Sequence, residues 1–262
     1  FMLSYYRKEL MIVHERQTKI LELLSQYKKI EVTKLSELLS VSQVTIRKDL
    51  MQLESSGLIL REHGYAALHD SDDLANRLVY HYEIKQRIAQ LAVEDVQDGE
   101  TLMIESGSCC ALVALEIAKT KKDVTVITNS AFIAAYIRKQ GSVRIILLGG
   151  EYQQSSQVMV GPMTRRCMEP FYVDKLFIGT DGFTKESGFT GNDYMRSETV
   201  RDMAQQANHV IVVTESLKFS QKGLVQLIDT AQIRTVVSDD HIPEECEQFL
   251  MEHGVEVKKV KN

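Results

Sequence analysis

The feature that most constrains the fold of this chain is an alternation of short apolar runs with helix-like segments, which continues from residue 83 almost to the end. Such alternation is typical of an α/β domain whose largely parallel sheet is covered by helices on both faces. The strand-like runs span residues 101–105, 124–128, 143–148, 175–179, 210–214, 235–238 and 255–260. The helix-like segments span residues 83–96, 110–120, 131–140, 198–207 and 244–253. We therefore predict an α/β domain over residues 83–262.

Polar residues and glycines gather in the loops that follow these strands. In parallel sheets, ligands bind outside the carboxyl ends of the strands. The backbone amides of Gly107, Ser108 and Cys109 lie where a helix is expected to begin and suit an anion, and Lys218 adds a point charge. Each loop alone is more often an ordinary connection, but several at one edge favour a small ligand that carries a phosphate. The candidate ligand residues in these loops are Glu105, Ser106, Gly107, Ser108, Cys109, Thr128, Asn129, Gly149, Gly150, Asp181 and Lys218.

Other kinds of ligand are not predicted. No segment resembles a Walker A motif or a complete dinucleotide glycine fingerprint, so we expect neither nucleoside triphosphates nor NAD, and no cofactor. The four cysteines and seven histidines show no metal-ligand spacing, and we expect no metal site. Cys109 and Cys110 are interpreted as small residues beside the ligand loop, with a redox switch as the alternative.

The segment before this domain has a different pattern. The length of 262 residues suggests two domains. We predict a helix that ends near Tyr27, a second helix capped by Thr33 and a third helix over residues 43–55 capped by Ser42. The second helix is expected to bury Leu35, Leu38 and Leu39, and the apolar positions of the third are Val44, Ile46, Leu50 and Leu53. Two short strands, 59–61 and 65–68, then form a wing around His63 and Gly64.

Two short helices joined by a tight turn match a helix-turn-helix, whose second helix enters the major groove of DNA. The alternative is a charged face on a structural three-helix bundle. Asp49 would repel phosphate on a DNA-facing surface, so we predict that it holds a neighbouring arginine or a helix N-terminus. The outward positions of the third helix are hydrogen-bonding or cationic, namely Ser42, Gln43, Thr45, Arg47, Lys48 and Gln52. The predicted DNA contacts are Ser42, Gln43, Thr45, Arg47 and Lys48, with Arg61 and His63 in the wing.

The charge distribution is consistent with an anion-binding first domain. Residues 7–65 carry ten Lys and Arg against eight Asp and Glu, which gives +2, whereas the remainder carries 21 against 28, which gives −7. The two sum to the net charge of −5. No apolar run approaches the ~18 residues of a membrane-spanning helix. The first residues are too polar for a signal peptide and the cysteines are few, so we expect a cytoplasmic protein without a membrane partner.

The residues of the third helix carry a resemblance to a known family. Arg16, Ile20 and Leu24, followed by the run Ser42, Thr45, Ile46, Arg47, Lys48, Asp49 and Leu50, resemble the helix-turn-helix signature of the DeoR family of bacterial repressors. The continuation through Leu53, Gly57, Leu58, Arg61, His63 and Gly64 is also similar, although Tyr65 stands where the family usually has a second glycine. The resemblance implies a winged helix-turn-helix domain over residues 11–69, a linker over 70–82, and double-stranded operator DNA as partner.

The resemblance extends to the α/β domain, which looks like the sensor domain of these repressors, a relative of the ribose-phosphate isomerase and CoA-transferase folds. Thr128-Asn129, Gly149-Gly150, Gly161, Asp174, Gly188 and Glu198 fit the family pattern, and Glu198 joins the candidate ligand residues. The first loop is usually Asp-x-Gly-Thr-Thr, whereas this chain has Glu105 and Cys109 at its ends. Near the end, Lys218 matches the family pattern, whereas Glu215 and Leu217 depart from it.

The resemblance implies a transcriptional repressor of a carbohydrate-utilisation operon that leaves its operator when a phosphorylated sugar or sugar alcohol binds. It also implies a homo-oligomer, a dimer or a tetramer, on repeated or palindromic half-sites. The alternative is a sugar-phosphate isomerase fused to a DNA-binding module, with Glu105, Asp181 and Glu198 as acid/base groups. We expect a regulator and not an enzyme, because a loop carboxylate is more often structural and the fused DNA-binding segment favours regulation.

Overall fold

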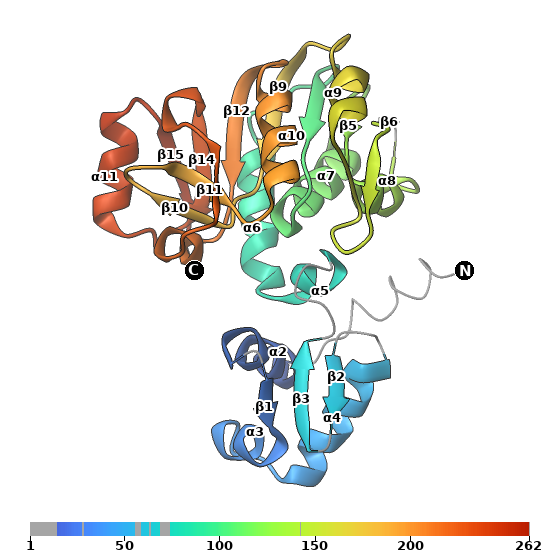
Figure 1. Ribbon diagram of the computed structural model, residues 1–262, viewed down its shortest axis with the longest axis vertical. Coiled ribbons are helices and arrows are strands. Elements are labelled where there is room, and N and C mark those ends of the chain that lie inside the picture. Colours follow the sequence, from blue (N-terminus) through green and yellow to red (C-terminus); the bar gives the residue numbers. More distant parts are fainter. Residues whose placement is uncertain are drawn as a thin grey trace. The chain divides into compact units, whose positions relative to one another are not determined.

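The computed structural model describes residues 15–27, 29–55, 59–62, 64–68, 74–141 and 143–261. The chain divides into two compact units, residues 1–82 and residues 83–262. After the functions that the resemblance implies, we call them the DNA-binding unit and the sensor unit. Within the described residues, the model has no helix that is both long and apolar enough to span a bilayer. Figure 1 shows the helices and strands of both units.

In the DNA-binding unit, the described residues between 15 and 68 form three helices and a small antiparallel sheet. Their core contains leucine and isoleucine side chains from each of these three helices and from the sheet, among them Ile20, Leu35, Leu50 and Ile59. The strands lie in the order β1-β3-β2. The elements are α2 (Glu15–Tyr27), β1 (Lys29–Glu31), α3 (Val32–Leu38), α4 (Gln43–Ser55), β2 (Ile59–Glu62) and β3 (Tyr65–Leu68). The predicted order of helices and the wing are confirmed, whereas β1 was not predicted because a run of three residues gives too little periodicity.

Two details of the predicted helices are wrong. Thr33 does not cap α3, which begins one residue earlier at Val32, and the Thr33 hydroxyl donates to the Glu31 carboxylate instead. Val44 and Leu38 were placed on apolar faces, but their side chains are 77% and 43% exposed. The faces of these helices are set by which neighbours pack against them, and a short apolar pattern does not specify this. Gly57, the predicted helix C-cap, lies outside the described residues.

The last described part of the DNA-binding unit is a short helix. Residues 74–79 of the predicted linker form α5 (Leu74–Val79), in which Leu74 and Leu78 are buried. The first helix of the sensor unit, α6 (Tyr82–Val93), follows within three residues. Residues 70–73, the acidic part of the predicted linker, lie outside the described residues.

The sensor unit is built on a seven-stranded parallel sheet with the order β15-β14-β12-β9-β4-β5-β6. Its strands are β4 (Thr101–Ile104), β5 (Thr125–Thr128), β6 (Arg144–Leu147), β9 (Val173–Ile178), β12 (Ala207–Val213), β14 (Thr235–Asp239) and β15 (Glu256–Val260). The middle of the sheet is buried because apolar residues dominate its inner strands, where Leu102, Val126 and Phe177 are fully buried. The predicted fold class and its parallel sheet are confirmed.

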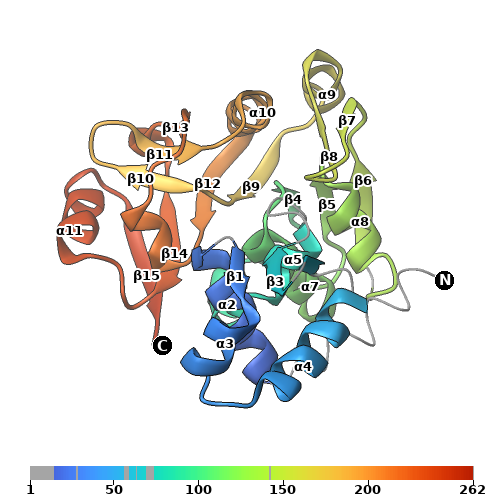
Figure 2. The same cartoon turned by 60° about the horizontal axis from the view of Figure 1, so that its bottom comes forward.

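Helices cover both faces of this sheet. Figure 2 shows α7 and α10 on opposite sides of the strands. The helices are α6, α7 (Ser108–Thr120), α8 (Ala131–Ile137), α9 (Pro162–Met168), α10 (Tyr194–Ala204) and α11 (Glu244–Glu252), with short 3₁₀ helices η1 (Ser216–Ser220) and η2 (Thr230–Gln232). The chain runs from β4 outward to β6, then returns to β9 and continues outward to β15. The order of strands therefore reverses between β4 and β9, the kind of position where open α/β sheets bind ligands.

Short antiparallel strands were not predicted in the sensor unit. One pair is β7 (Glu151–Gln153) with β8 (Val158–Val160), and a second small sheet joins β10 (Gly182–Thr184), β11 (Gly188–Gly191) and β13 (Val225–Ile228). Phe183 and Phe189 of the second sheet pack against Phe219 in a buried apolar cluster of the unit. The runs are three or four residues long, and their place is fixed by these aromatic contacts more than by local pattern.

Candidate functional site

The first candidate site is the exposed face of α4, which we call the α4 face and define as Gln43, Val44, Arg47, Lys48 and Met51. These five side chains are all exposed, whereas the opposite side of the helix buries Ile46, Asp49, Leu50 and Leu53. The alternation follows from helical spacing, because positions three and four residues apart share a face. A helix with one buried apolar side and one exposed side rich in donors is what a recognition helix requires.

Ser42 caps this helix as predicted. Its hydroxyl oxygen accepts a hydrogen bond from the Thr45 backbone amide at 3.2 Å, and the Ser42 and Thr45 hydroxyl oxygens lie 2.9 Å apart. Such a cap satisfies one of the amides that have no partner at a helix start. Both hydroxyls therefore have a partner at the helix start, although Ser42 and Thr45 were predicted to contact DNA.

Asp49 holds an arginine, as predicted. The Arg16 guanidinium on α2 donates from Nε to Oδ2 at 2.5 Å and from Nη2 to Oδ1 at 3.0 Å. The hydrogen bonds to Asp49 and its negative charge raise the pKa of Arg16 above its ordinary value. The Asp49 carboxylate is buried, so the pair joins α2 to the inner side of α4 and keeps this negative charge off the α4 face.

The predicted wing residues have different positions. Arg61 on β2 is exposed and pairs with Glu54 of α4 at 3.3 Å. His63 lies outside the described residues. Tyr65, which replaces the usual second glycine, begins β3, and its hydroxyl donates to Glu31 at 2.5 Å. This hydrogen bond lowers the pKa of Glu31 and raises the pKa of Tyr65. The turn itself is made by Gly64 in the left-handed region, so the tyrosine does not occupy the position that requires glycine.

The second candidate site is the carboxyl edge of the sensor sheet, which we call the ligand edge: the loops that follow β4, β5, β6, β9, β12 and β14. Because all strands are parallel, the predicted loops lie along one edge in the order of the strands. The loops after β4 and β9 meet at the strand-order reversal. There the Gly179 amide lies 3.4 Å from Glu105 Oε2, and the Ser106 hydroxyl donates to Glu105 Oε1 at 2.9 Å.

The backbone conformation at this point requires glycine. Gly107 has a φ of 138°, which residues with side chains rarely adopt, whereas a Cβ there would make only ordinary contact, 3.9 Å from the Gly179 Cα. Gly107 is the N-cap residue of α7 and contributes no side-chain hydrogen bond to the helix start. A helix start that follows a glycine, with the hydroxyl of Ser108 in its first turn, favours an anion.

The loop after β5 is held by hydrogen bonds of its own polar side chains. The Ser130 hydroxyl caps α8 by accepting from the Ile133 amide at 3.2 Å, so this helix start is satisfied by its own side chain. The Asn129 side-chain amide donates to the Met159 carbonyl at 3.0 Å, and Thr128 Oγ1 accepts from the Ser130 amide. All three polar residues are buried. Thr128 and Asn129 thus shape the edge from within, and Asn129 Oδ1 is a buried acceptor without a partner in the described structure.

Two glycines allow the loop after β6 to pack tightly against its neighbours. At Gly150 a Cβ would lie 1.9 Å from Thr164 Oγ1 and 2.9 Å from the Val160 carbonyl oxygen, so only glycine fits. Gly149 is less constrained, with Cys167 Sγ 3.6 Å from such an atom. The Gly149-Gly150 pair therefore lets this loop pack against β8 and α9.

Two predicted carboxylates are engaged in structural contacts. Asp181 Oδ2 accepts from the Asn192 amide at 2.9 Å, which joins the loop after β9 to the end of β11. Glu198 lies on α10 and pairs with Arg201, whose guanidinium also donates to the Gln226 carbonyl of β13. The side chain of Glu198 is 46% exposed. The structure thus brings Glu105, Ser106, Gly107 and Ser108 together and places Glu198 on a helix surface.

Lys218 lies in η1, and its ammonium donates to Gln221 Oε1 at 3.1 Å. The start of η1 is anchored by Asp239, whose Oδ1 and Oδ2 accept from the Ser216 amide at 2.7 Å and the Ser216 hydroxyl at 2.5 Å. Leu217, one of the departures from the family pattern, is 55% exposed, so it does not fill the core beneath the loop.

Lys85 at the ligand edge was missed by the sequence analysis. It lies on the inner face of α6 with only 4% of its side chain exposed, and its ammonium is 3.3 Å from Glu215 Oε2 in the loop after β12. The sequence pattern that indicates its burial is helical spacing. Lys85 precedes the buried residues Ile88, Ala89 and Ala92 by three, four and seven positions and therefore lies on the same helix face. A cation in an apolar stripe is expensive unless it is paired, so it indicates a functional or structural partner.

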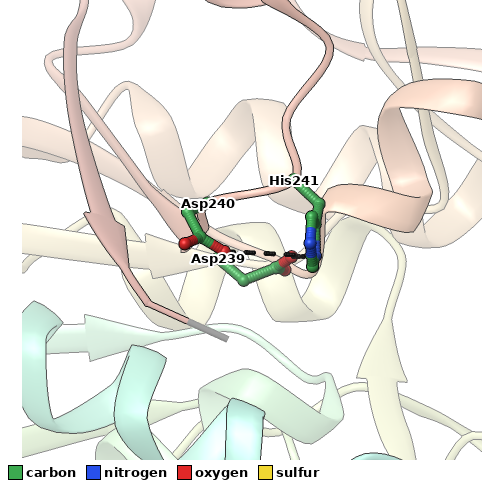
Figure 3. Close-up of side chains that lie close together, drawn as sticks. All are labelled: Asp239, Asp240 and His241. Carbon is green, nitrogen blue, oxygen red and sulfur yellow. Dashed lines mark ion pairs between the residues drawn. The ribbon is translucent and has the colours of Figure 1, made fainter.

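Asp239, Asp240 and His241 gather where β14 ends (Figure 3). The His241 Nδ1 lies 3.6 Å from Asp239 Oδ2 and 4.0 Å from Asp240 Oδ1. Both oxygens of Asp239 already accept hydrogen bonds from Ser216, and Asp240 and His241 are exposed. The two hydrogen bonds from Ser216 thus explain the position of Asp239 as the residue that holds η1, without a metal ion.

A helix-turn-helix unit with an exposed, donor-rich recognition helix, joined to an α/β unit with a ligand edge, defines a transcriptional regulator with a DNA-binding part and a sensor part. Residues 16–72 match the family model described as the DeoR-like helix-turn-helix domain, and residues 80–240 match the model described as the DeoR C-terminal sensor domain. The chain belongs to the DeoR family, and the expectation from the resemblance is confirmed.

Similar proteins carry regulator names. The HTH-type transcriptional regulator GlpR of Haloferax volcanii is 30% identical and covers 94% of this chain and 98% of its own length. The glycerol-3-phosphate regulon repressor of Escherichia coli K12 is 29% identical, over 93% and 98%. The L-fucose operon activator of Haemophilus influenzae is 25% identical, over 92% and 97%.

Solved structures are more distant. The sorbitol operon regulator SorC of Klebsiella pneumoniae aligns over 91% of this chain and all of that chain, with 10% identity and a TM-score of 0.40. Ribose 5-phosphate isomerase of Plasmodium falciparum aligns over 54% of this chain and 55% of that chain, with 18% identity and a TM-score of 0.39. At these TM-scores the matches add nothing to the assignment of this chain's function.

Proposed function

We propose that this protein is a cytoplasmic repressor of a carbohydrate-utilisation operon and that a phosphorylated sugar or sugar alcohol releases it from its operator. It acts as a homo-oligomer, a dimer or a tetramer, so that two α4 faces meet two half-sites. The names of similar proteins support control of carbon-source operons, and repressors and an activator both occur among them. A repressor is the simpler device here, because occupancy of the operator alone blocks transcription.

The observation that carries the sensor half of this proposal is the start of α7. It lies where the order of strands reverses, and its N-cap residue Gly107 has no side chain to cap the helix and holds a φ of 138° that other residues rarely adopt. A phosphate placed there would accept hydrogen bonds from backbone amides at the helix start and from the hydroxyl of Ser108. Glu105 would then accept from a sugar hydroxyl, since a carboxylate is a poor neighbour for the phosphate itself.

Release from DNA follows from differential binding. A ligand that binds better to the arrangement that cannot hold DNA shifts the population toward that arrangement. The paired Lys85 and Glu215 join α6 to the loop before η1, so movement of that loop on binding reaches the first helix of the sensor unit. The Lys85–Glu215 pair therefore connects the ligand edge to α6, the helix with which the sensor unit begins.

The test is a thermal-shift screen of sugar phosphates and sugar-alcohol phosphates beside their unphosphorylated forms. A ligand present at 100 times its Kd adds about 2.7 kcal/mol to stability and moves the melting midpoint by several degrees. The proposal expects a shift with one phosphorylated compound, no shift with its unphosphorylated form, and loss of operator binding at the same concentration. A shift that is equal with and without the phosphate would overturn the placement of a phosphate at α7.

The enzyme alternative has a separate test. Glu105, Asp181 and Glu198 were considered as acid/base groups, but Asp181 and Glu198 hold neighbouring elements and Glu105 holds the Gly179 amide. We infer that the ligand edge binds without turnover. Sustained conversion of an aldose phosphate to a ketose phosphate that disappears in Glu198→Gln would contradict this inference.

A further inference from the structure

Among the described residues of the DNA-binding unit, Val44 is the most exposed large apolar side chain. It is the second residue of α4, and 77% of it is accessible to solvent. A β-branched residue at an exposed helix position gains nothing from burial and has a weaker helix propensity than the long polar residues. Its position is therefore not explained by the stability of the unit.

The neighbours of Val44 indicate what covers it. Arg47 and Lys48 lie three and four residues further along the helix, both are exposed, and neither makes an ion pair within the part of the chain that the structure describes. Two uncompensated cations beside an apolar side chain match a polyanion that also presents apolar groups. The major groove of DNA does both, because phosphates border it and the C5 methyl group of thymine projects into it.

The first turn of α4 offers few other groups that can read a base. The Ser42 and Thr45 hydroxyls interact with each other, and Ser42 Oγ also caps the helix. Gln43 and Val44 are the remaining exposed side chains of that turn. In helix-turn-helix proteins the N-terminal residues of the recognition helix contact the base edges. Val44, next to Gln43, is thus positioned to contact a base, and its side chain carries no hydrogen-bonding group.

We propose that Val44 specifies a thymine in each operator half-site through contact of its isopropyl group with the C5 methyl group. The inference rests on the proposed DNA-binding function and assigns a specificity-determining residue within it. Gln43 reads a neighbouring hydrogen-bonding edge, while Arg47 and Lys48 contact phosphates or a guanine. Val44 discriminates by shape, because no other base carries a methyl group at this position of the groove.

The test begins with selection of binding sites from a random duplex library by the full-length protein. Each thymine of the selected duplex is then replaced by uracil, which pairs identically and lacks only the methyl group. We expect one thymine per half-site at which the replacement weakens binding about 3- to 10-fold, as for loss of one buried methyl group. In Val44→Ser this replacement should change affinity less than about 2-fold.

Val44→Thr is the matched variant, because threonine differs from serine by one methyl group and should recover part of the uracil sensitivity. Tyr27→Ala, at the end of α2, is the control for loss of an exposed apolar side chain outside the α4 face. If Val44→Ser selects the same sequence and keeps the same uracil sensitivity at every thymine, the inference is wrong. If the wild-type protein selects no sequence at all, the proposed DNA-binding function fails instead, so the two failures are distinguishable.

Discussion

The α4 face and the ligand edge hold their functional side chains in opposite ways. On the α4 face, Arg47, Lys48 and Gln43 stand in solvent on a helix whose position is fixed from behind by Leu50 and by the Arg16–Asp49 pair. At the ligand edge, Glu105 and Lys85 are buried and held by partners from other elements. We therefore expect that side chains of the α4 face can be replaced without loss of stability, whereas replacing those of the ligand edge destabilises the sensor unit.

The largest effect that this comparison predicts is on stability. Lys85→Ala leaves the Glu215 carboxylate without its buried cation, and we expect the free energy of unfolding of the sensor unit to fall by about 3 kcal/mol. Chemical denaturation of the full chain measures this free energy of unfolding. Lys259→Ala removes a half-exposed pair with Glu247 and should cost less than about 1 kcal/mol. Equal losses in the two variants would remove the distinction between a buried and a surface pair.

The next effect is on operator affinity alone. Arg47→Ala should weaken operator binding by about 1–3 kcal/mol and leave the melting midpoint unchanged. If Arg47 contacts a guanine, the loss falls on sites with that base and specificity relaxes. If it contacts phosphate, the loss is uniform and the salt dependence becomes shallower. Binding titrations at several salt concentrations separate the two, and a lowered melting midpoint would show that the α4 face is not independent of the fold.

A smaller loss of stability combined with a specific loss of response is expected at Gly107. An alanine there must adopt a φ of 138°, which costs about 1–2 kcal/mol and tilts the backbone at the start of α7. The thermal shift with the effective sugar phosphate should disappear while operator binding persists. Gly99→Ala at the opposite end of β4 is the control, since Gly99 also has positive φ but faces open space. It should lose similar stability and keep the response.

The smallest effect concerns the wing. In Tyr65→Phe, Glu31 loses the hydrogen bond that contributes most to its lowered pKa, so the pKa should rise toward the ordinary value; an NMR titration of the Glu31 carboxyl measures this. A lowered folded-state pKa contributes stability above the unfolded pKa that is lost as the pH falls through the folded pKa. The variant should therefore lose less stability on acidification than the wild type. An unchanged Glu31 pKa would show that Tyr65 does not hold the wing to β1.

Much of the molecule was predictable because local pattern and final environment agree. The inner strands of the parallel sheet are buried, so their apolar runs are nearly continuous and their ends were placed within a few residues. Asp49 was predicted to hold a neighbouring arginine or a helix N-terminus, because a carboxylate on a DNA-facing helix would repel phosphate, and the structure selects the arginine. Of the α4 face, Gln43, Arg47 and Lys48 were predicted, whereas Val44 and Met51 were not, because their exposure contradicts their apolar character.

The sequence by itself determined the order of elements, the parallel sheet and the set of loops at its carboxyl edge, because hydrophobic periodicity and turn residues act locally. Only the tertiary structure decided that Gly107 meets Gly179, that Lys85 reaches Glu215 across 130 residues of chain, and that the antiparallel strands close over Phe219. These contacts depend on which strands become neighbours, and the reversal of strand order between β4 and β9 is a property of the assembled sheet. The packing of the whole unit, and no single segment, therefore positions the ligand edge.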